Sequence, residues 1–491
     1  MRRGRIGRPH CLGLVLAGCL FAALVAGSAG ASDPTFTPAA GSPVATGSYP
    51  TSLAFGDLNG DGKRDMAVTR YFSNVSILLG DGAGGFGVPK PVLAGSNPNR
   101  VVVAELNGDG KADLAVTNFG SGTVSILLGD GTGGVLNDTG PPIAVGNHPY
   151  RLAAADLNGD GHTDLVVANG SENGPHKVSL LLGDGTGSFS LAAGSPVASG
   201  NGYYLFSFAV ADLNADGKRD LAVANNGLDN VSILLGDGTG GFSAASGSPV
   251  AVGSYPSSVV AAELNGDGKP DLAVANFTST DISILLGDGS GGFSTAAGSP
   301  VAAGGNPAQL AAADLNGDGR TDLAYLNTPQ VFNTPSTVSM LLGDGAGGFG
   351  TVETVGPTGN SPSFVAATDL NGDHKPDLAV ANYDSSNATI LLNTTQLPTA
   401  VALRGFAALR TPHGVELRWR TAQEASLLGF DVYRSGVKLN RTLIAARGGA
   451  GGAVHRLFDP GARVRAASTY RLQAVRLDGT RIWIGKATAK R

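Results

Sequence analysis

The sequence predicts an all-β protein, in which a seven-bladed β-propeller over residues 36–397 is followed by a small β-sandwich over residues 400–491. Two observations predict the propeller. A nine-residue acidic motif, DLNGDGKRD in its first copy, occurs seven times at spacings of 48 to 56 residues, and such periods are typical of propellers and solenoids. Residues 36–395 also show no helical periodicity of useful length, so strands are expected between the motifs.

Each repeat is expected to form one blade of four antiparallel strands. In the repeat that begins at Gly253, SSVVAAEL leads into the acidic motif and DLAVAN leaves it, then DISILLG and FSTAAGSPVAA follow. These runs are short, rich in β-forming residues and bounded by turn residues. Much of the glycine content, 75 residues, falls at these recurrent turns.

The two ends of the repeat region favour a closed ring over an open solenoid. The last repeat stops at ATILLNTT, residues 388–395, without a fourth strand. The segment FTPAAGSPVATGSYP at residues 36–50 resembles FSAASGSPVAVGSYP at residues 242–256, which is a fourth strand and the entry to the next repeat. We therefore expect an N-terminal outer strand to complete the last blade and close the ring.

The acidic motifs place oxygen-bearing side chains at positions one, three, five and nine, with a backbone carbonyl available at position seven. Oxygen ligands without His or Cys favour Ca²⁺ over zinc or copper, and Mg²⁺ is the second choice. The expected side-chain ligands are Asp57, Asn59, Asp61, Asp65, Glu105, Asn107, Asp109, Asp113, Asp156, Asn158, Asp160, Asp164, Asp212, Asn214, Asp216, Asp220, Glu263, Asn265, Asp267, Asp271, Asp314, Asn316, Asp318, Asp322, Asp369, Asn371, Asp373 and Asp377.

The alternative is a plain turn, because Asn, Asp and Gly are also favoured turn residues. A hairpin does not need three carboxylates in one small loop, where they repel each other unless a cation lies between them. We therefore expect up to seven Ca²⁺ sites. The fourth loop has Ala215 in place of a glycine, and the Asp369–Asp377 loop departs further because His374 stands where a glycine with positive φ is expected.

The repeat DLNGDGKxDLAVAN…VSILLGDGxGGF resembles the FG-GAP/VCBS repeats of integrin α-subunit propellers and of many secreted bacterial proteins. The resemblance covers roughly residues 36–395. It implies a propeller with calcium bound in the loop between the first and second strands of each blade.

Residues 1–31 are predicted to be a signal peptide cleaved after Ala31, because a basic start precedes an apolar run and the small residues Ala29-Gly30-Ala31. The apolar run is shorter than the ~20 residues that span a membrane. The minor alternative is lipid anchoring at Cys19, which ends a lipobox-like Leu16-Ala17-Gly18-Cys19. Cys11 and Cys19 are the only cysteines, so the mature, secreted chain would have no disulfide.

Residues 400–491 resemble a fibronectin type III-like module in the strands around VELRWR, GFDVYR and TYRLQAVRLDG. Residues 401–491 contain 17 Lys and Arg but only 5 Asp and Glu, whereas the chain as a whole has a net charge of −5. This basic module could associate with the cell envelope. A nucleic-acid partner is not expected for an exported protein.

The leading hypothesis for function is an adhesion or recognition module that binds an extracellular glycan or protein. The loops opposite the acidic motifs vary most and carry many aromatic residues, which either bind a ligand or pack between blades. Tyr150 with Arg151, and Tyr203 with Tyr204, break the repeat pattern and are the candidate ligand-binding residues. No nucleophile elbow, HExxH or phosphate-loop motif is present, so no catalytic residue is expected; the alternative is a secreted polysaccharide-active enzyme or its substrate-binding part.

Overall fold

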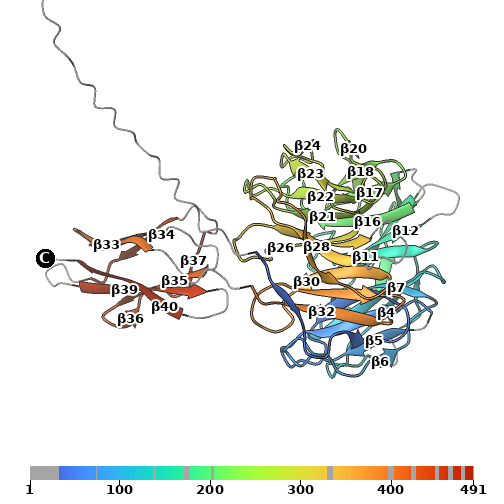
Figure 1. Cartoon of the computed structure of the whole chain (residues 1–491), viewed down its shortest axis with the longest axis horizontal. Coiled ribbons are helices and arrows are strands. Elements are labelled where there is room, and N and C mark those ends of the chain that lie inside the picture. Colours follow the sequence, from blue (N-terminus) through green and yellow to red (C-terminus); the bar gives the residue numbers. More distant parts are fainter. Residues whose placement is uncertain are drawn as a thin grey trace, which may run out of the picture. The chain divides into compact units, whose positions relative to one another are not determined.

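The computed structural model describes residues 33–72, 74–136, 140–170, 176–200, 204–328, 336–395, 403–421, 427–447, 453–462, 468–476 and 481–489. The predicted signal peptide and its cleavage site, Cys19, and Tyr203 lie outside these ranges. Every regular element in the described residues is a β-strand, and the strands form small antiparallel sheets (Figure 1). The all-β prediction is therefore confirmed. In the same residues, no helix is long and apolar enough to span a membrane.

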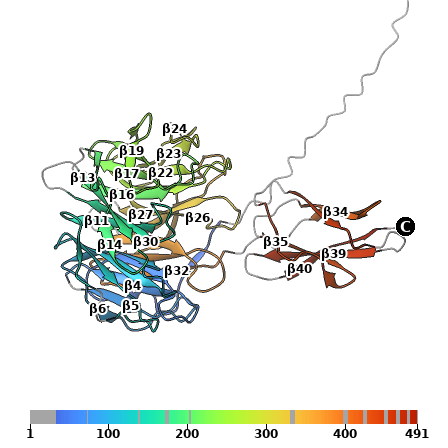
Figure 2. The same cartoon turned by 180° about the vertical axis from the view of Figure 1, so that it is seen from behind.

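Between residues 36 and 393 the described strands form seven sheets of four or five strands, and in each sheet the first, second and third strands lie side by side in chain order (Figures 1 and 2). The first strands of these sheets are β3 (Pro50–Gly56), β7 (Pro98–Ala104), β11 (Pro149–Ala155), β16 (Tyr204–Ala211), β21 (Pro256–Ala262), β26 (Asn306–Ala313) and β30 (Pro362–Thr368).

The second strand of each sheet begins at the ninth residue of an acidic motif, and most of its residues are buried. These strands are β4 (Asp65–Arg70), β8 (Asp113–Asn118), β12 (Asp164–Asn169), β17 (Asp220–Asn226), β22 (Asp271–Asn276), β27 (Asp322–Thr328) and β31 (Asp377–Asn382). The third strands are β5 (Val75–Leu78), β9 (Thr123–Leu127), β13 (His176–Gly183), β18 (Asn230–Gly236), β23 (Asp281–Gly287), β28 (Thr337–Leu341) and β32 (Asn387–Asn393).

The outer position of each sheet is filled by one short strand or by two strands that pair with the same third strand. The single outer strands are β6 (Lys90–Val92), β10 (Ile143–Ala144) and β29 (Glu353–Pro357). The divided ones are β14 (Phe189–Leu191) with β15 (Val197–Gly200), β19 (Phe242–Ala244) with β20 (Val250–Ala251), β24 (Phe293–Thr295) with β25 (Val301–Ala302), and β1 (Phe36–Pro38) with β2 (Val44–Ala45).

The N-terminal strands join the last sheet rather than the first. Phe36 lies opposite Asn393, and Val44 lies opposite Ala388, so both β1 and β2 pair with β32. In Figure 1 the blue N-terminal segment accordingly runs beside the orange strand β32. Ser42 reinforces the pairing, since its hydroxyl accepts a hydrogen bond from the N–H of Ile390 at 2.9 Å.

The hydrophobic core lies between the sheets. Each of seven clusters of buried side chains combines two sheets that follow each other along the chain, except that one cluster joins the first sheet to the last. In that cluster Met66 and Leu78 of the first sheet pack with Ala381 and Ile390 of the last, and Val44 of β2 belongs to it. A buried aliphatic side chain contributes about 1.5–3 kcal/mol. The arrangement is that of a repeat, propeller-like fold.

Residues 403–489 form two further sheets, whose strands pair only among themselves in the described ranges. One contains β33 (Leu403–Thr411), β34 (Gly414–Thr421) and β38 (Val454–Asp459). The other contains β35 (Leu427–Arg434), β36 (Val437–Lys438), β37 (Ile444–Ala445), β39 (Ser468–Arg476) and β40 (Arg481–Ala489). Trp419, Phe430 and Tyr470 are buried in their shared core.

The pairing of β2 with the last sheet predicts different effects for two neighbouring substitutions. Val44 is 7% exposed in the core between the first and last sheets, whereas Ala45 is exposed. Val44→Asp is expected to destabilise the protein by about 3 kcal/mol because it buries an unpaired charge, and Ala45→Asp by less than about 1 kcal/mol. Urea unfolding of both variants measures the difference, and equal effects would contradict this packing.

Candidate metal centre and ligand-binding face

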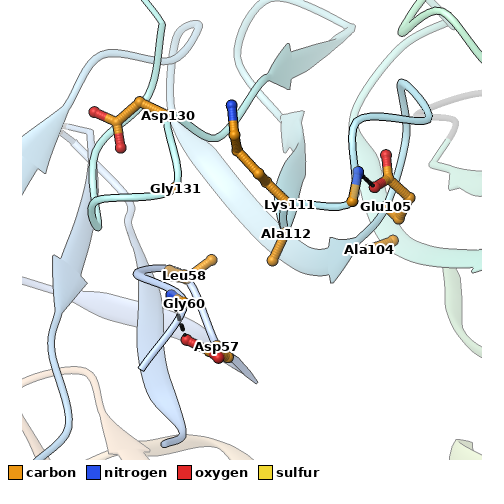
Figure 3. A pocket seen from close by; sticks show the side chains of 10 residues that line it. Asp57, Leu58, Gly60, Ala104, Glu105, Lys111, Ala112, Asp130 and Gly131 are labelled. Carbon is orange, nitrogen blue, oxygen red and sulfur yellow. Dashed lines mark hydrogen bonds between the residues drawn. The ribbon is translucent and has the colours of Figure 1, made fainter. Parts of the chain in front are cut away.

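Each acidic loop is held in a tight curve by hydrogen bonds from its own backbone. In the first loop, the Asp57 carboxylate accepts hydrogen bonds from the N–H groups of Gly60 at 2.7 Å (Figure 3), Asp61 at 3.1 Å and Gly62 at 2.8 Å. Asn59 Oδ1 accepts one from Asp61 N–H, and Asp61 Oδ1 accepts one from Lys63 N–H, both at 3.0 Å. The side chains at positions one, three and five therefore fold back over the loop that carries them.

Two positions of the loop need a left-handed backbone, which explains their glycines. Gly60 and Gly62 have φ values of 76° and 80°. In the fourth loop Ala215 takes φ 60°, and in the seventh His374 takes φ 64°. The expectation that His374 occupies a positive-φ position is therefore confirmed. A non-glycine residue with this backbone stores strain of about 1 kcal/mol or more.

The aspartate at position nine is buried and joins two parts of its sheet. Asp65 is 0% exposed; its Oδ2 accepts the N–H of Leu58 at 2.9 Å, and its Oδ1 accepts the N–H of Gly80 at 2.8 Å. Leu58 lies in the loop, and Gly80 follows the third strand. The same pair of bonds recurs in all seven motifs, through Asp113, Asp164, Asp220, Asp271, Asp322 and Asp377.

This role was not foreseen from the sequence, which suggested only metal ligation. The signal was available, because each of these aspartates begins a strand whose residues are almost all apolar. Each carboxylate oxygen has a further lone pair, so the structural role does not preclude a ligand role.

Burial and neighbouring charges make these carboxyl groups hard to ionise in the absence of a cation. Burial, together with a smaller effect of the nearby carboxylates of Asp314 and Asp318, raises the pKa of Asp322 to about 7. Burial likewise raises the pKa of Asp377 and of Asp314 to about 6. A bound cation would offset both the desolvation and the repulsion.

The donor set of each loop fits Ca²⁺ in chemical type, with carboxylates, a side-chain amide and a backbone carbonyl. In the ranges that the structure describes, no group of three or more His, Cys, Asp or Glu side chains is arranged to hold a metal ion. A site at these loops would draw in addition on Asn59 and its equivalents and on the position-seven carbonyl. Calcium binding stays a prediction.

The GDG turns are structural hairpin turns. Asp81 Oδ1 accepts hydrogen bonds from the N–H groups of Ala83 at 2.7 Å and Gly85 at 2.9 Å, and the Asp81 N–H donates to the Gly85 carbonyl. One such turn, at Asp130 and Gly131, borders a cavity of about 520 Å³ between the first two acidic loops (Figure 3). Asp57, Glu105 and Lys111 also line this cavity.

Aromatic side chains from four sheets meet in one aromatic cluster, which comprises Tyr49, Tyr71, Phe72, Phe119, His148, Tyr150 and Tyr383. The Tyr49 ring lies 5.4 Å from that of Phe72 and 5.0 Å from that of Tyr383, measured between centroids. Phe72 is 66% exposed and Tyr49 is 39% exposed. The ring of Tyr49, just before a first strand, is therefore in contact with Phe72 and Tyr383, which follow second strands.

The candidate residues Tyr150 and Arg151 face different surroundings. Tyr150 belongs to the aromatic cluster, with its ring centroid 4.9 Å from that of Phe119. The Arg151 guanidinium instead donates a hydrogen bond to Gln309 Oε1 at 2.6 Å, inside a separate cavity. Tyr204 begins β16, but its side chain lies outside the described part of the structure, as does all of Tyr203.

Comparison with known proteins identifies the repeat. A model of the FG-GAP-like repeat matches residues 57–116, 106–167, 156–223, 212–274 and 263–325, and a model of the FG-GAP repeat matches residues 361–392. Because these matches cover more than half of the chain, the protein belongs to the FG-GAP-like repeat family. No curated protein matches it by sequence.

Two solved structures resemble the chain weakly. BBS1N, solved in complex with ARL6DN, is 14% identical, with 75% of this chain and 98% of that chain covered and a TM-score of 0.48. A luciferin-regenerating enzyme is 12% identical, with 65% of this chain and 99% of that chain covered and a TM-score of 0.39. At these scores neither resemblance bears on function.

The buried ninth-position carboxylate predicts a stability difference between two aspartates of the fifth repeat. Asp271→Ala leaves the buried N–H groups of Leu264 and Gly287 without acceptors and is expected to cost about 3 kcal/mol. Asp288→Ala removes bonds to Ser290 and Gly292 in an exposed turn, where water replaces the acceptor, and should cost about 1 kcal/mol or less. Urea unfolding in EGTA isolates these hydrogen bonds from any metal ligation. Equal losses would show that the buried carboxylate is no more important than a turn residue.

Proposed function

We propose that the protein is a secreted, calcium-stabilised, seven-bladed β-propeller that recognises an extracellular glycan or protein. The observation that carries the recognition role is the exposed aromatic cluster, because its rings come from four sheets and two of them, Tyr49 and Phe72, are exposed. The proposal has three parts, which concern the ring, the metal and the ligand.

The first part is that the seven sheets close into a ring. The pairing of β1 and β2 with β32 supports it, as does the core cluster between the first and last sheets. A third observation is a cavity lined by residues from the first strands of all seven sheets, as the centre of a closed ring would be.

The second part is that Ca²⁺ occupies the acidic loops and stabilises the fold. Extracellular sites of this type bind with Kd on the order of 10⁻⁴–10⁻³ M. At about ten times Kd each site adds roughly 1.4 kcal/mol, so seven sites would add about 10 kcal/mol. Since the mature chain has no cysteine for disulfides, calcium would be its main reinforcement.

The third part is that the aromatic cluster binds the ligand. Aromatic faces pack against the apolar faces of sugar rings and against apolar side chains, and their exposure here leaves them available. We assign no catalytic residue, so the module is proposed to bind without turnover. The C-terminal sheets are proposed to form a fibronectin type III-like spacer whose basic charge aids attachment to the cell envelope.

Calcium is expected to raise Tm on the order of 10 °C over EGTA at pH 7.5. The rise should shrink at pH 5, because folded Asp322, with a pKa of about 7, and Asp377, with a pKa of about 6, bind protons in competition with the cation. In EGTA, the stability of the protein is expected to change with pH in the opposite direction. Because the pKa values of these groups are raised in the folded state, protonation favours the folded state as the pH falls from about 7 toward 4. Differential scanning calorimetry at both pH values tests this, and a Tm that does not respond to EGTA at pH 7.5 would refute the stabilising role.

Ligand recognition is tested on a glycan array, with an array of extracellular proteins as a second arm. Tyr49 and Tyr255 stand in the same GSYP sequence of two repeats and share positive φ values of 56° and 58°, but Tyr255 belongs to a sheet that contributes no ring to the aromatic cluster. Tyr49→Ala is expected to weaken binding at least about tenfold, and Tyr255→Ala to leave it within about twofold. Equal losses of binding in the two variants would show that the aromatic cluster is not the binding site. Shortened oligosaccharide products would favour the enzyme alternative.

A further inference from the structure

A second site, separate from the acidic loops and the aromatic cluster, is indicated by the cavity among the first strands. It has a volume of about 410 Å³, and β3, β7, β11, β16, β21, β26 and β30 all contribute residues to its wall. Most of the wall is apolar, formed by valine, leucine, alanine and phenylalanine side chains. The charged residues that line it are Arg100 and Arg151, and none of its lining residues has a carboxylate.

The two arginines occupy equivalent positions in neighbouring repeats. Each is the second residue after the proline that begins its strand, Pro98 or Pro149. In the first and fifth repeats this position is serine, at Ser52 and Ser258. The equivalent residues of the sixth and seventh sheets are Gln309 and Phe364, which line the same cavity. The strand therefore does not require arginine at this position. Two of the repeats nevertheless have an arginine here, and both arginines line the cavity.

Arg100 is the stronger indication of a ligand. The residue is only 8% exposed, yet its Nη1 has no hydrogen-bond partner among the residues that the structure describes. Its Cζ lies 4.5 Å from the centroid of the Phe364 ring, which is a cation–π contact. An aromatic ring accepts no charge-assisted hydrogen bond from Nη1, so this N–H group is left without an acceptor. A buried cationic donor in this state is destabilising unless an anion accepts a hydrogen bond from it.

Arg151 adds a second cation with a fixed orientation. Its Nη2 donates to Gln309 Oε1 at 2.6 Å. Desolvation lowers the pKa of its guanidinium to about 10, so it is still charged at neutral pH.

We propose that this cavity is a binding site for a carboxylate, supplied by a small organic acid or by an acidic sugar, with Arg100 as its principal ligand-binding residue. A guanidinium edge matches the two oxygens of a carboxylate, and charge-assisted bonds of this kind are about twice as strong as neutral ones. The apolar wall would contact the carbon skeleton of the acid. Inorganic phosphate has no such skeleton and is expected to bind more weakly.

The test is isothermal titration calorimetry on the full mature chain in CaCl₂, with four probes. Glucuronate represents an acidic sugar, malate a small organic acid, glucose the neutral sugar, and inorganic phosphate a competing anion. We expect glucuronate or malate to bind, and glucose and phosphate to bind at least about tenfold more weakly. Binding of glucuronate alone assigns an acidic sugar, and preference for malate assigns a small acid. No binding by either acid, or equal binding by glucose or phosphate, overturns the carboxylate site.

Substitutions locate the binding. Arg100→Gln is expected to weaken binding of the preferred acid at least about tenfold, whereas Arg420→Gln, on the exposed surface of β34, should leave it unchanged. Arg100→Lys retains the charge without the planar edge and should give an intermediate loss. Tm values of the variants without acid establish that they are folded; since Arg100 is a buried cation, its removal should not lower Tm in that condition. Unchanged acid binding by folded Arg100→Gln or Arg100→Lys would overturn the assignment.

Discussion

The buried carboxylate at the ninth position of each acidic motif is the interaction on which the repeat depends. It accepts one N–H from the loop before it and one from the end of the third strand, and it does so in all seven sheets. The loop, the second strand and the third strand are thereby joined at a single residue. An aspartate in this position is costly because burial raises its pKa, and the two backbone bonds offset part of that cost.

The side chains at positions one, three and five connect the fold to the proposed metal binding. The loop curves because its own N–H groups bond to Asp57, Asn59 and Asp61, so the oxygens are gathered before any cation arrives. Such preorganisation reduces the entropic cost of ordering the ligand groups when a cation binds. A loop that serves first as a turn can then gain stability from a cation of modest affinity.

Positions that are the same in every repeat serve the fold, whereas the proposed recognition residues lie at positions where the repeats differ. The acidic loops and GDG turns are nearly identical from sheet to sheet, and their polar side chains accept hydrogen bonds from the backbone of the same loop or turn. The aromatic cluster and the arginine-containing cavity instead use positions where the repeats differ, such as Phe72 beside Tyr71, or Arg100 where another repeat has Ser52. Seven similar sheets supply a rigid frame, and the residues that vary at equivalent places are free to determine the ligand.

Much of the secondary structure and repeat architecture of this protein is determined by local sequence. The motif spacing, the strand runs and the glycines predicted the all-β repeat, because turns and alternating burial depend on neighbouring residues. The left-handed backbone of His374 could be anticipated for the same reason. The tertiary structure decided which distant residues meet, such as Tyr49 with Tyr383 and Arg151 with Gln309. Those contacts depend on how whole sheets pack against one another, which no short segment of the chain encodes.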